Sequence, residues 1–449
     1  MSTQAVSAPR QRWIRIIPVA FLMYTIAFMD RINVGFGFTG MEKTLGFGAE
    51  VSGLVGGIFF FGYMFLQIPG GQLAVKWSAR KFVTISLIAW GIFAVLTGLV
   101  QNTAELLIVR FLLGVAEGGV WPATLVLLAN WFPNEERARA NSYWMFCLPV
   151  ASIIMSPISG WILTWTDWRT LFILEGLPPL VWALIWWLAV ADTPDDAKWL
   201  SPEERAYLDQ KLAEDHRAAP QTDERASWSD ALKDGKVWWL VIVYFLIQVG
   251  FYGVSLWLPV MVKGLTKSGF GLVGILAALP YVAAVIGLYI NANHSDRTGE
   301  RKFHVAIPLI IGGIALLLSG LLGPRSALLG MIFLILTEGF MLPYVGVFWT
   351  LPPLFLHKES VGSGMGLINA LGNLGGFVGP FLVGYFISST GSTFTGIVVL
   401  CISLVVAGLM TIVFRYEHPR PAVMPEMPEA STEESDMRTV PPDRHRVAS

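Results

Sequence analysis

The chain has 449 residues, of which 54% are hydrophobic and only 14% charged, and its mean hydropathy is +0.59. Soluble globular domains carry about 25% charged residues, so the composition excludes an ordinary soluble protein and is typical of one that crosses a membrane repeatedly. A net charge of −1 gives no basic field for a nucleic acid. The two cysteines, Cys147 and Cys401, do not support a disulfide framework or a cysteine metal site.

Twelve apolar segments approach or exceed the roughly 20 residues that a helix needs to cross a bilayer. Their apolar runs are continuous, which favours helices over the alternating strands of a barrel. We therefore predict an all-α membrane protein with twelve transmembrane helices. The expected spans are 14–38, 52–75, 82–100, 104–130, 140–163, 170–191, 237–262, 270–292, 303–323, 328–356, 362–388 and 393–415.

The long hydrophilic stretch 192–236 separates six spans from the other six. Within it, Ser201 and Glu204 form a capping box and Pro202 stands at the first helical position, which predicts a linker helix along the membrane surface. The expected domains are a cytoplasmic segment, a six-helix half, a cytoplasmic linker, a second six-helix half, and a disordered tail rich in Pro, Glu and Ser. Their bounds are 1–13, 14–191, 192–236, 237–415 and 416–449.

Lysine and arginine placement predicts that both termini are cytoplasmic. With that orientation, twelve basic residues lie in the short inner segments: Arg10, Arg12, Arg15, Lys76, Arg80, Lys81, Arg137, Arg139, Arg297, Arg301, Lys302 and Lys358. Five lie in the outer loops: Lys43, Arg169, Lys263, Lys267 and Arg325.

The chain also contains an internal repeat at an offset of 221 residues. Arg80-Lys81-Phe82 recurs as Arg301-Lys302-Phe303, and Glu117-Gly118-x-x-x-Pro122 recurs as Glu338-Gly339-x-x-x-Pro343. Each match falls at the equivalent place in its half. Two repeated six-helix halves with a site between them are a transporter architecture.

Two charged residues stand well inside the fourth apolar segment, away from its ends: Arg110 and Glu117. A charge in hydrocarbon costs at least about 2.5–3.5 kcal/mol and usually marks an ion or substrate pathway. Seven residues along a helix place the two side chains on one face, about 10 Å apart. That distance is too long for a direct ion pair and leaves room for a third group.

Further motifs occur along the chain: Tyr24-x5-Asp30-Arg31-Ile32-Asn33, Arg110 to Pro122, Trp131-Phe132-Pro133, Leu174-Glu175-Gly176, Asp192-Thr193-Pro194, Ser295-Asp296-Arg297 and Asn369-Ala370-Leu371-Gly372-Asn373. With these motifs, the sequence resembles the major facilitator superfamily, and within it the anion:cation symporter family. It extends over nearly the whole chain and is nearest to bacterial carriers of tartrate and 4-hydroxyphenylacetate. One departure is Val75, which stands where the superfamily usually has an aspartate.

The resemblance implies that Asp30 and Glu117 bind the coupled protons. Alternatively, Asp30 pairs locally with Arg31, and Glu117 is a structural carboxyl group. Arg110 presents a planar fork suited to a carboxylate and is the expected anion anchor, although it can also act as a counter-ion for Glu117 or Asp30. Glu338 mirrors Glu117 without an arginine seven residues earlier, and is either a packing residue or an additional site.

Further residues are expected to line a polar cavity for the substrate: Arg31, Tyr24, Tyr63, Gln248, Tyr252, Trp349, Asn369 and Asn373. The expected gating loops contain Arg80, Lys81, Asp296, Arg297 and Arg301. All six histidines lie in loops or tails, so a histidine proton relay within the membrane is not expected. The sequence has no nucleophile triad, metal-ligand cluster or phosphate-binding glycine loop, and no enzyme activity, metal or cofactor is expected.

We therefore expect proton-coupled uptake of a small organic anion, such as a hydroxy acid, sugar acid or aromatic carboxylate, by a monomer in a bacterial inner membrane. Sodium coupling is an open alternative. A proton-driven exporter of drugs or metabolites is a second possibility, and a membrane sensor a third. The longest cytosolic segment is too short and too charged to form a sensor domain's core.

Overall fold

The computed structural model describes residues 11–218, 224–356 and 360–415, and within these the chain is helical with no strand. The helices of the first half are α1 (Gln11–Ile32), α2 (Val34–Leu45), α3 (Ala49–Leu73), the π-helix η1 (Ala74–Ser78), α4 (Ala79–Thr97), α5 (Thr103–Gly118), α6 (Val120–Trp131), α7 (Asn134–Met145), α8 (Cys147–Trp165) and α9 (Trp168–Ala189). The linker contains η2 (Pro194–Asp196), α10 (Pro202–Ala218) and α11 (Glu224–Lys233). The second half has α12 (Gly235–Thr266), α13 (Phe270–Thr298), α14 (Lys302–Leu322), α15 (Ala327–Met341), α16 (Tyr344–Phe348), η3 (Pro352–Leu354), α17 (Val361–Gly372), α18 (Gly375–Thr390) and α19 (Thr393–Val413). The predicted tail 416–449 lies outside the described residues.

Among the described residues, eleven continuous stretches are long and apolar enough to cross a membrane, against the twelve spans predicted. The difference arises in Ala49–Thr97, which has 49 residues. A straight helix of that length would be about 70 Å long, more than twice the hydrocarbon thickness. At Ser78 the backbone is extended (φ −177°, ψ 124°), and the Ser78 hydroxyl accepts from the Lys81 backbone N–H. This stretch therefore contains two spans, α3 and α4, as the sequence predicted.

Five predicted spans are divided by a short interruption of the helix. The interruptions fall at Asn33, at Gly119, at Phe146, at Leu342–Pro343, and at Asn373–Leu374. The backbone angles at these points stay in the right-handed helical region, so each span continues in nearly the same direction. The first span is also longer than expected, because α2 continues to Leu45. Asp30 accordingly lies near the middle of Gln11–Leu45.

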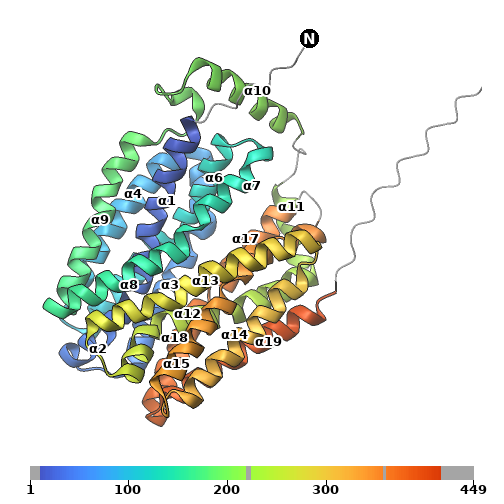
Figure 1. Ribbon diagram of the computed structural model, residues 1–449. Helices are drawn as coiled ribbons and strands as arrows, with labels where there is room; N and C mark the ends of the chain where they lie inside the picture. Colours follow the sequence, from blue (N-terminus) through green and yellow to red (C-terminus); the bar gives the residue numbers. More distant parts are fainter. Residues whose placement is uncertain (1–10, 219–223, 357–359, 416–449) are drawn as a thin grey trace, which may run out of the picture.

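The two halves of the chain lie side by side, with α10 at one end of the molecule and α2 at the other (Figure 1). They meet closely at the end away from α10, where glycines let backbones touch. A Cβ on Gly53 of α3 would overlap the Pro380 carbonyl oxygen of α18. A Cβ on Gly274 of α13 would overlap the Ser156 carbonyl oxygen of α8, and one on Gly160 would lie 2.8 Å from the Gly274 Cα. Small residues at such crossings are characteristic of membrane helix packing.

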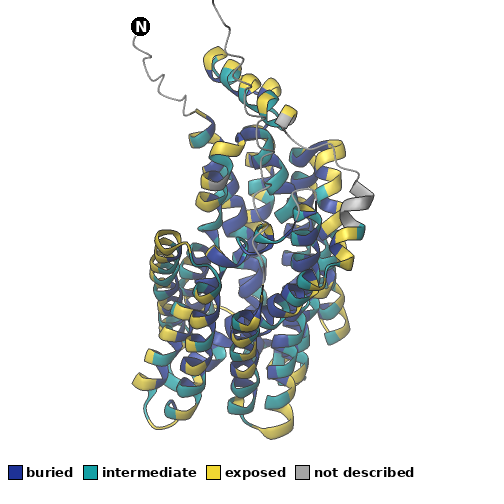
Figure 2. Cartoon of the chain, turned by 90° about the vertical axis from the view of Figure 1, so that its right-hand side faces the viewer, coloured by how far each residue is buried: buried dark blue, intermediate teal, exposed yellow. Residues whose placement is uncertain are grey.

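Figure 2 shows buried residues concentrated between the helices and exposed ones on the outer surface. Many of these exposed residues are large and apolar, among them Phe65, Trp161, Leu188 and Ile290. A soluble protein rarely exposes so much contiguous apolar surface. The outer surface is therefore suited to lipid.

The linker is attached to the first half by buried charges. Arg12 Nη1 donates to Glu204 Oε1 at 2.6 Å, and Arg12 Nη2 donates to Glu136 Oε2 at 2.5 Å. The Arg12 and Glu204 side chains are fully buried. Ser201 Oγ accepts from the Glu204 backbone N–H at 3.2 Å, as the capping box predicts. The Glu204 carboxylate, however, accepts from the Gln11 and Arg12 backbone N–H groups and so caps α1. The predicted linker helix is thus present, and it is fixed to the N-terminus of α1.

We expect Glu204→Ala to release the linker, because removing one partner of a buried ion pair costs about 3–5 kcal/mol. Trypsin should then cleave the linker faster, and the purified protein should unfold at a lower temperature in detergent. Glu203→Ala is the matched control, since Glu203 is the exposed neighbour on the same helix turn. Equal effects of the two changes would contradict this account of the linker.

We also expect Gly274→Val to force apart the ends of α8 and α13, because the added side chain would overlap the Ser156 backbone. Spin labels at the exposed residues Trp165 and Leu272, with Cys147 and Cys401 replaced by serine, should report a longer distance by double electron–electron resonance. Gly264→Ala is the control, since a Cβ at Gly264 meets nothing within 4 Å. An unchanged distance in Gly274→Val would show that this contact does not hold the ends together.

Candidate functional site

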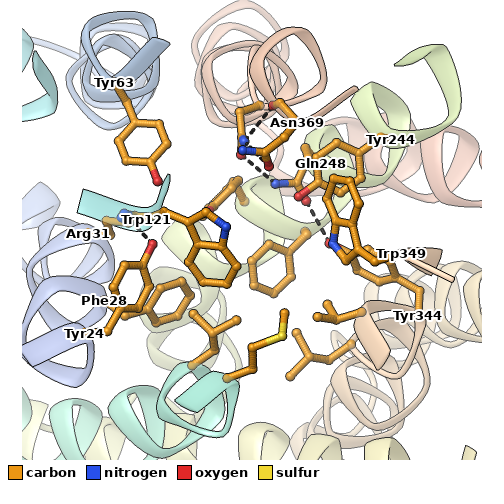
Figure 3. Close-up of a pocket in the computed structure, with 17 residues that line it drawn as sticks. Tyr24, Phe28, Arg31, Tyr63, Trp121, Tyr244, Gln248, Tyr344, Trp349 and Asn369 are labelled. Atoms are coloured by element: carbon orange, nitrogen blue, oxygen red, sulfur yellow. Dashed lines mark hydrogen bonds between the residues drawn. The ribbon is translucent and has the colours of Figure 1, made fainter. Parts of the chain in front are cut away.

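A cavity lies between the two halves, and residues of both halves line it (Figure 3). Eight of the nine residues expected to bind substrate are in its wall. The lining comprises Tyr24, Phe28, Arg31, Tyr63, Trp121, Met145 and Leu148 from the first half, and Tyr244, Gln248, Phe251, Tyr252, Leu342, Tyr344, Val345, Trp349, Asn369 and Asn373 from the second. Nine of these residues are aromatic, and Arg31 is the charged residue among them.

Arg110, the ninth expected residue, lies behind this wall and does not line the cavity. Its side chain is fully buried, and its guanidinium carbon is 5.3 Å from the centre of the Phe59 ring. None of its three guanidinium nitrogens has a hydrogen-bond partner among the described residues. Asp30 and Glu117 are the acidic groups that act on it electrostatically.

Arg31 occupies the position between the cavity and Glu117. Its Nε donates to Glu117 Oε1 at 2.6 Å, and its Nη2 donates to the same oxygen and to the Tyr24 hydroxyl, the latter at 3.1 Å. The guanidinium carbon also lies 4.4 Å from the centre of the Tyr63 ring. The Glu117 side chain is fully buried, and its Oε2 has no partner among the described residues. Thus the first helix supplies the partner of Glu117.

Asp30 does not pair with its neighbour Arg31. Its Oδ1 accepts from Asn33 Nδ2 at 3.2 Å, and its buried Oδ2 has no partner among the described residues. Arg110 is the strongest of the positive charges that act on Asp30, ahead of Arg31. The two adjacent side chains therefore serve different partners, because successive residues of a helix point about 100° apart.

Glu175 of α9 is a further buried acid of the site that was not among the predicted functional residues. Glu175 Oε2 accepts from Asn33 Nδ2 at 2.9 Å, and Glu175 Oε1 lies 2.5 Å from the Ser159 hydroxyl. Asn33 thus bonds to both Asp30 and Glu175. The same rule that drew attention to Glu117, an acidic residue inside an apolar segment, would have identified Glu175 within 170–191.

The second half contributes a chain of neutral hydrogen bonds. The Tyr344 hydroxyl donates to Gln248 at 2.9 Å, and Gln248 donates to Asn373 at 3.0 Å. Asn373 donates to Asn369, and Asn369 donates to Gln67 of α3 at 3.0 Å. The last bond joins the two halves. Asn373 stands at the interruption between α17 and α18.

Glu338 lies apart from these groups and does not line the cavity. It is fully buried on α15, and neither carboxyl oxygen has a partner among the described residues. The charge of an ionised Glu338 would act on the hydroxyl groups of Tyr281 and Tyr344. At the offset of the repeat, Tyr252 stands at the position equivalent to Arg31, the partner of Glu117, and Met331 at the position equivalent to Arg110. The repeat therefore provides no arginine for Glu338 at either position.

The two expected gating loops each bond within their own half. Arg80 donates to the Trp187 carbonyl and stacks 4.2 Å from the Trp187 ring. Asp192 accepts from the Ser78 hydroxyl at 2.5 Å and from the Arg80 backbone at 2.8 Å. Its carboxylate therefore caps α4, while Val75, at the position where the superfamily has an aspartate, is exposed. The Lys81 backbone N–H donates to Ser78.

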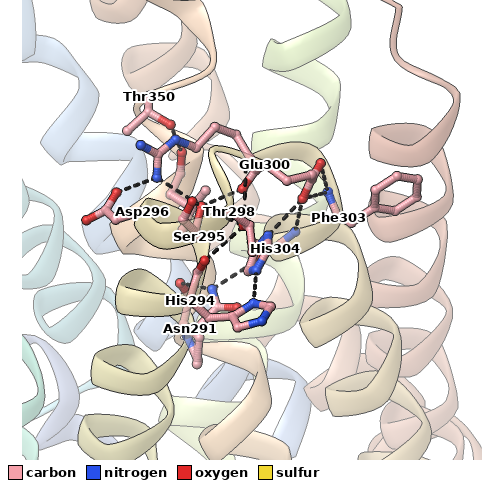
Figure 4. A network of polar contacts seen from close by, with 12 residues as sticks. Asn291, His294, Ser295, Asp296, Thr298, Glu300, Phe303, His304 and Thr350 are labelled. Atoms are coloured by element: carbon pink, nitrogen blue, oxygen red, sulfur yellow. Dashed lines mark hydrogen bonds and ion pairs between the residues drawn. The ribbon is translucent and has the colours of Figure 1, made fainter.

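At the end of α13, Asp296 pairs with Arg301 at 2.5 Å, and Arg301 also donates to Ser295 (Figure 4). His304 bonds to Glu300 at 2.8 Å and to His294 at 2.6 Å. These two histidines lie in α14 and α13 and not, as the sequence suggested, in loops. Arg297, in the last turn of α13, has an exposed side chain. These contacts stabilise the turn between α13 and α14.

The charges of the site are confined to the first half. Asp30, Arg31, Arg110, Glu117 and Glu175 are all buried there, whereas the cavity wall of the second half contains amides and aromatic rings. Such a site can bind an anion at Arg31 and change the protonation of nearby acids. It has no arrangement for covalent chemistry.

A sequence profile described as Major Facilitator Superfamily matches residues 20–380. The chain belongs to this superfamily. A putative tartrate transporter of Agrobacterium vitis is 34% identical over 90% of this chain and 91% of its own length. A quinolone resistance transporter of Acinetobacter baumannii is 34% identical over 88% of this chain and 92% of its own length. Both are transporters by name, and superfamily membership confirms the prediction that the protein is not an enzyme.

The solved structure of the xylose transporter XylE from E. coli superposes with a TM-score of 0.72 at 15% identity, covering 90% of this chain and 99% of that one. A bacterial homologue of the lysosomal transporter Spinster gives a TM-score of 0.70 at 16% identity, covering 90% and 96%. The predicted fold of two six-helix halves is therefore confirmed as that of the superfamily.

We expect Asn373→Leu to lower the free energy of unfolding by about 1–3 kcal/mol, because Gln248 and Asn369 would each lose a buried hydrogen-bond partner. Chemical or thermal unfolding in detergent measures the change. Asn293→Leu is the control, since Asn293 is exposed and bonds within its own helix. A loss no larger than that of the control would contradict the proposed importance of the chain of amides.

Proposed function

We propose that this protein takes up a small organic anion together with protons, by alternating access between its two halves. One observation supports this most directly. Arg31 lies on the cavity wall while its guanidinium is paired with Glu117, a fully buried acid. An anion that enters the cavity competes with Glu117 for that guanidinium.

The competition couples the anion to a proton. A carboxylate that loses its positive partner in a low-dielectric interior is strongly destabilised and takes up a proton. Binding of an anion to Arg31 therefore favours protonated Glu117, and release of the anion favours its deprotonation. Asp30, which faces Arg110, is proposed as the second proton-binding residue, and Arg110 as the charge that controls it.

The cavity wall indicates the class of substrate. A planar guanidinium suits a carboxylate, and aromatic rings such as Tyr63, Trp121 and Trp349 suit flat or ring-shaped bodies. Gln248, Asn369 and Asn373 offer neutral hydrogen bonds for hydroxyl groups. We propose hydroxy acids, sugar acids and hydroxylated aromatic acids, with the carboxylate at Arg31.

The same proposal places the protein in a bacterial inner membrane with both termini cytoplasmic, acting as a monomer divided into 14–191 and 237–415. The gating loops with Arg80, Lys81, Asp296, Arg297 and Arg301 would then lie on the cytoplasmic side. Glu338 is proposed as an additional protonatable residue of the second half.

Drug export is the second candidate, and the relative named as a quinolone resistance transporter favours it. The nine aromatic residues of the cavity would also suit an amphipathic drug. The direction of driven transport separates the two candidates. A proton-driven exporter moves its substrate in the direction opposite to the protons, whereas the proposed importer moves both in the same direction.

The decisive experiment is uptake into proteoliposomes under an imposed pH gradient, with tartrate, sugar acids and hydroxylated aromatic acids tested in parallel. We expect concentrative uptake of at least one acid when the outside is acidic. Glu117→Gln should abolish gradient-driven uptake while it leaves exchange of substrate between equal solutions. A sodium gradient tests the alternative ion. If no acid moves, or if uptake ignores both gradients, the proposal fails.

We expect Arg31→Lys to weaken binding of the transported acid by about tenfold or more, because lysine is a point charge that loses the bidentate fork and the stacking on Tyr63. Arg110→Lys should alter the pH dependence of transport. At a pH low enough to protonate the acids of the site, it should weaken substrate binding less than Arg31→Lys does, because Arg110 lies behind the cavity wall. Binding affinity at two pH values distinguishes these roles. The opposite ranking would make Arg110 the anion anchor that the sequence suggested.

A further inference from the structure

The first half buries three acids and two arginines in one connected group. Asp30 lies at its centre. The charges of Arg31 and Arg110 act on Asp30, and the charge of Asp30 acts on Glu117 and on Glu175. If every group were ionised, the net charge would be −1. A buried uncompensated charge is costly, and a buried acid avoids the cost by keeping its proton. The substrate-free group therefore holds one proton.

The contacts favour Glu175 as the acid that holds it. Glu117 is paired with Arg31, and the positive charges of Arg110 and Arg31 both act on Asp30. Glu175 bonds to two neutral side chains, Asn33 and Ser159. The charged group that faces it is Asp30 of α1, while α2, α4 and α8, which pack nearby, bring no charged group that acts on it. Glu175 is thus the acid of the group without a positive partner.

The Ser159 hydroxyl gives independent support. It lies 2.5 Å from Glu175 Oε1 and 2.8 Å from Met155 Sδ. One hydroxyl proton cannot be donated to both. If the Glu175 carboxyl group is protonated, it donates to Ser159 Oγ, and Ser159 donates to the methionine sulfur. Both short contacts are then satisfied.

We propose, on the basis of the proposed function, that Glu175 is a further proton-binding site of the transport cycle that exchanges its proton with Asp30. Asn33 Nδ2 bonds to both carboxyl groups and holds them together. In the exchange, the Glu175 O–H bond breaks and an O–H bond forms at Asp30 Oδ2, which has no other partner among the described residues. Glu175 becomes the carboxylate, and it is protonated again by a hydronium ion from the acidic side, which leaves as water.

The position of Glu175 fits reloading from the side away from the linker. Glu175 is seven residues from Trp168, the first residue of α9, which is about 10 Å along the helix. Trp168 bonds to Thr44 in the last turn of α2, at the end opposite α10 (Figure 1). Asp30, near the middle of its span, lies deeper. Protons from that side would reach Glu175 before Asp30.

The test compares two assays in proteoliposomes, with the acid that the wild-type protein transports. Glu175→Gln preserves the size and hydrogen bonds of the side chain but cannot titrate. We expect uptake driven by the pH gradient to fall by at least about tenfold, because glutamine cannot bind the proton; tenfold is the change in a proton-binding constant that one pKa unit represents. Substrate exchange between equal solutions should stay at the wild-type rate. Glu175→Asp, which still titrates, should restore part of the driven uptake.

Two further variants complete the test. Glu105→Gln makes the same chemical change at an exposed residue and should leave both assays unchanged. Asn33→Ser keeps both carboxyl groups but removes the amide between them, and it should also lower driven uptake more than exchange. Wild-type driven uptake in folded Glu175→Gln or Asn33→Ser overturns the role of Glu175, as does an equal loss of both activities in both variants. Absence of driven uptake in the wild-type protein would instead refute the proposed function.

Discussion

The buried ion pair between Arg31 and Glu117 is the interaction on which the rest of the site depends. Removing two charges from water costs several kcal/mol each, and a buried pair recovers this only with good geometry and additional hydrogen bonds. Here Tyr24 and the Tyr63 ring provide further contacts to the guanidinium. Yet one carboxyl oxygen and the whole Arg110 guanidinium lack hydrogen-bond partners among the described residues. An anion or a proton that enters the site can therefore change which of these buried charges are paired.

The interrupted helices lie beside the polar groups of the site. The interruptions at Asn33, Gly119 and Asn373 fall close to Asp30, Glu117 and the amide chain respectively. Asn33 keeps right-handed helical backbone angles (φ −57°, ψ −29°), so it stands about one turn beyond Asp30 on the same face. From there its side chain bonds to both Asp30 and Glu175.

Much of this could be predicted from the sequence, because membrane spans, charge cost and repeats depend on local composition. The twelve spans, the linker helix and eight of the nine cavity residues follow from such local rules. The partner of Glu117 could not be predicted, since Arg31 and Arg110 are both arginines in apolar segments and only helix packing decides which one reaches it. The closeness of Glu175 to Asp30 was hidden for the same reason, because 145 positions of sequence separate the two acids. The broken spans were missed because glycine, asparagine and proline are common inside membrane helices.

The contact between the halves has a consequence for the energetics of the cycle. The ion pairs found among the described residues lie within one half, within the linker, or between the linker and the first half. The halves meet through close glycine packing and through neutral hydrogen bonds, Asn369 to Gln67 and Glu50 to Ser388. In the proposed cycle, the halves would therefore separate by breaking packing contacts and neutral hydrogen bonds, without pulling apart any of these ion pairs.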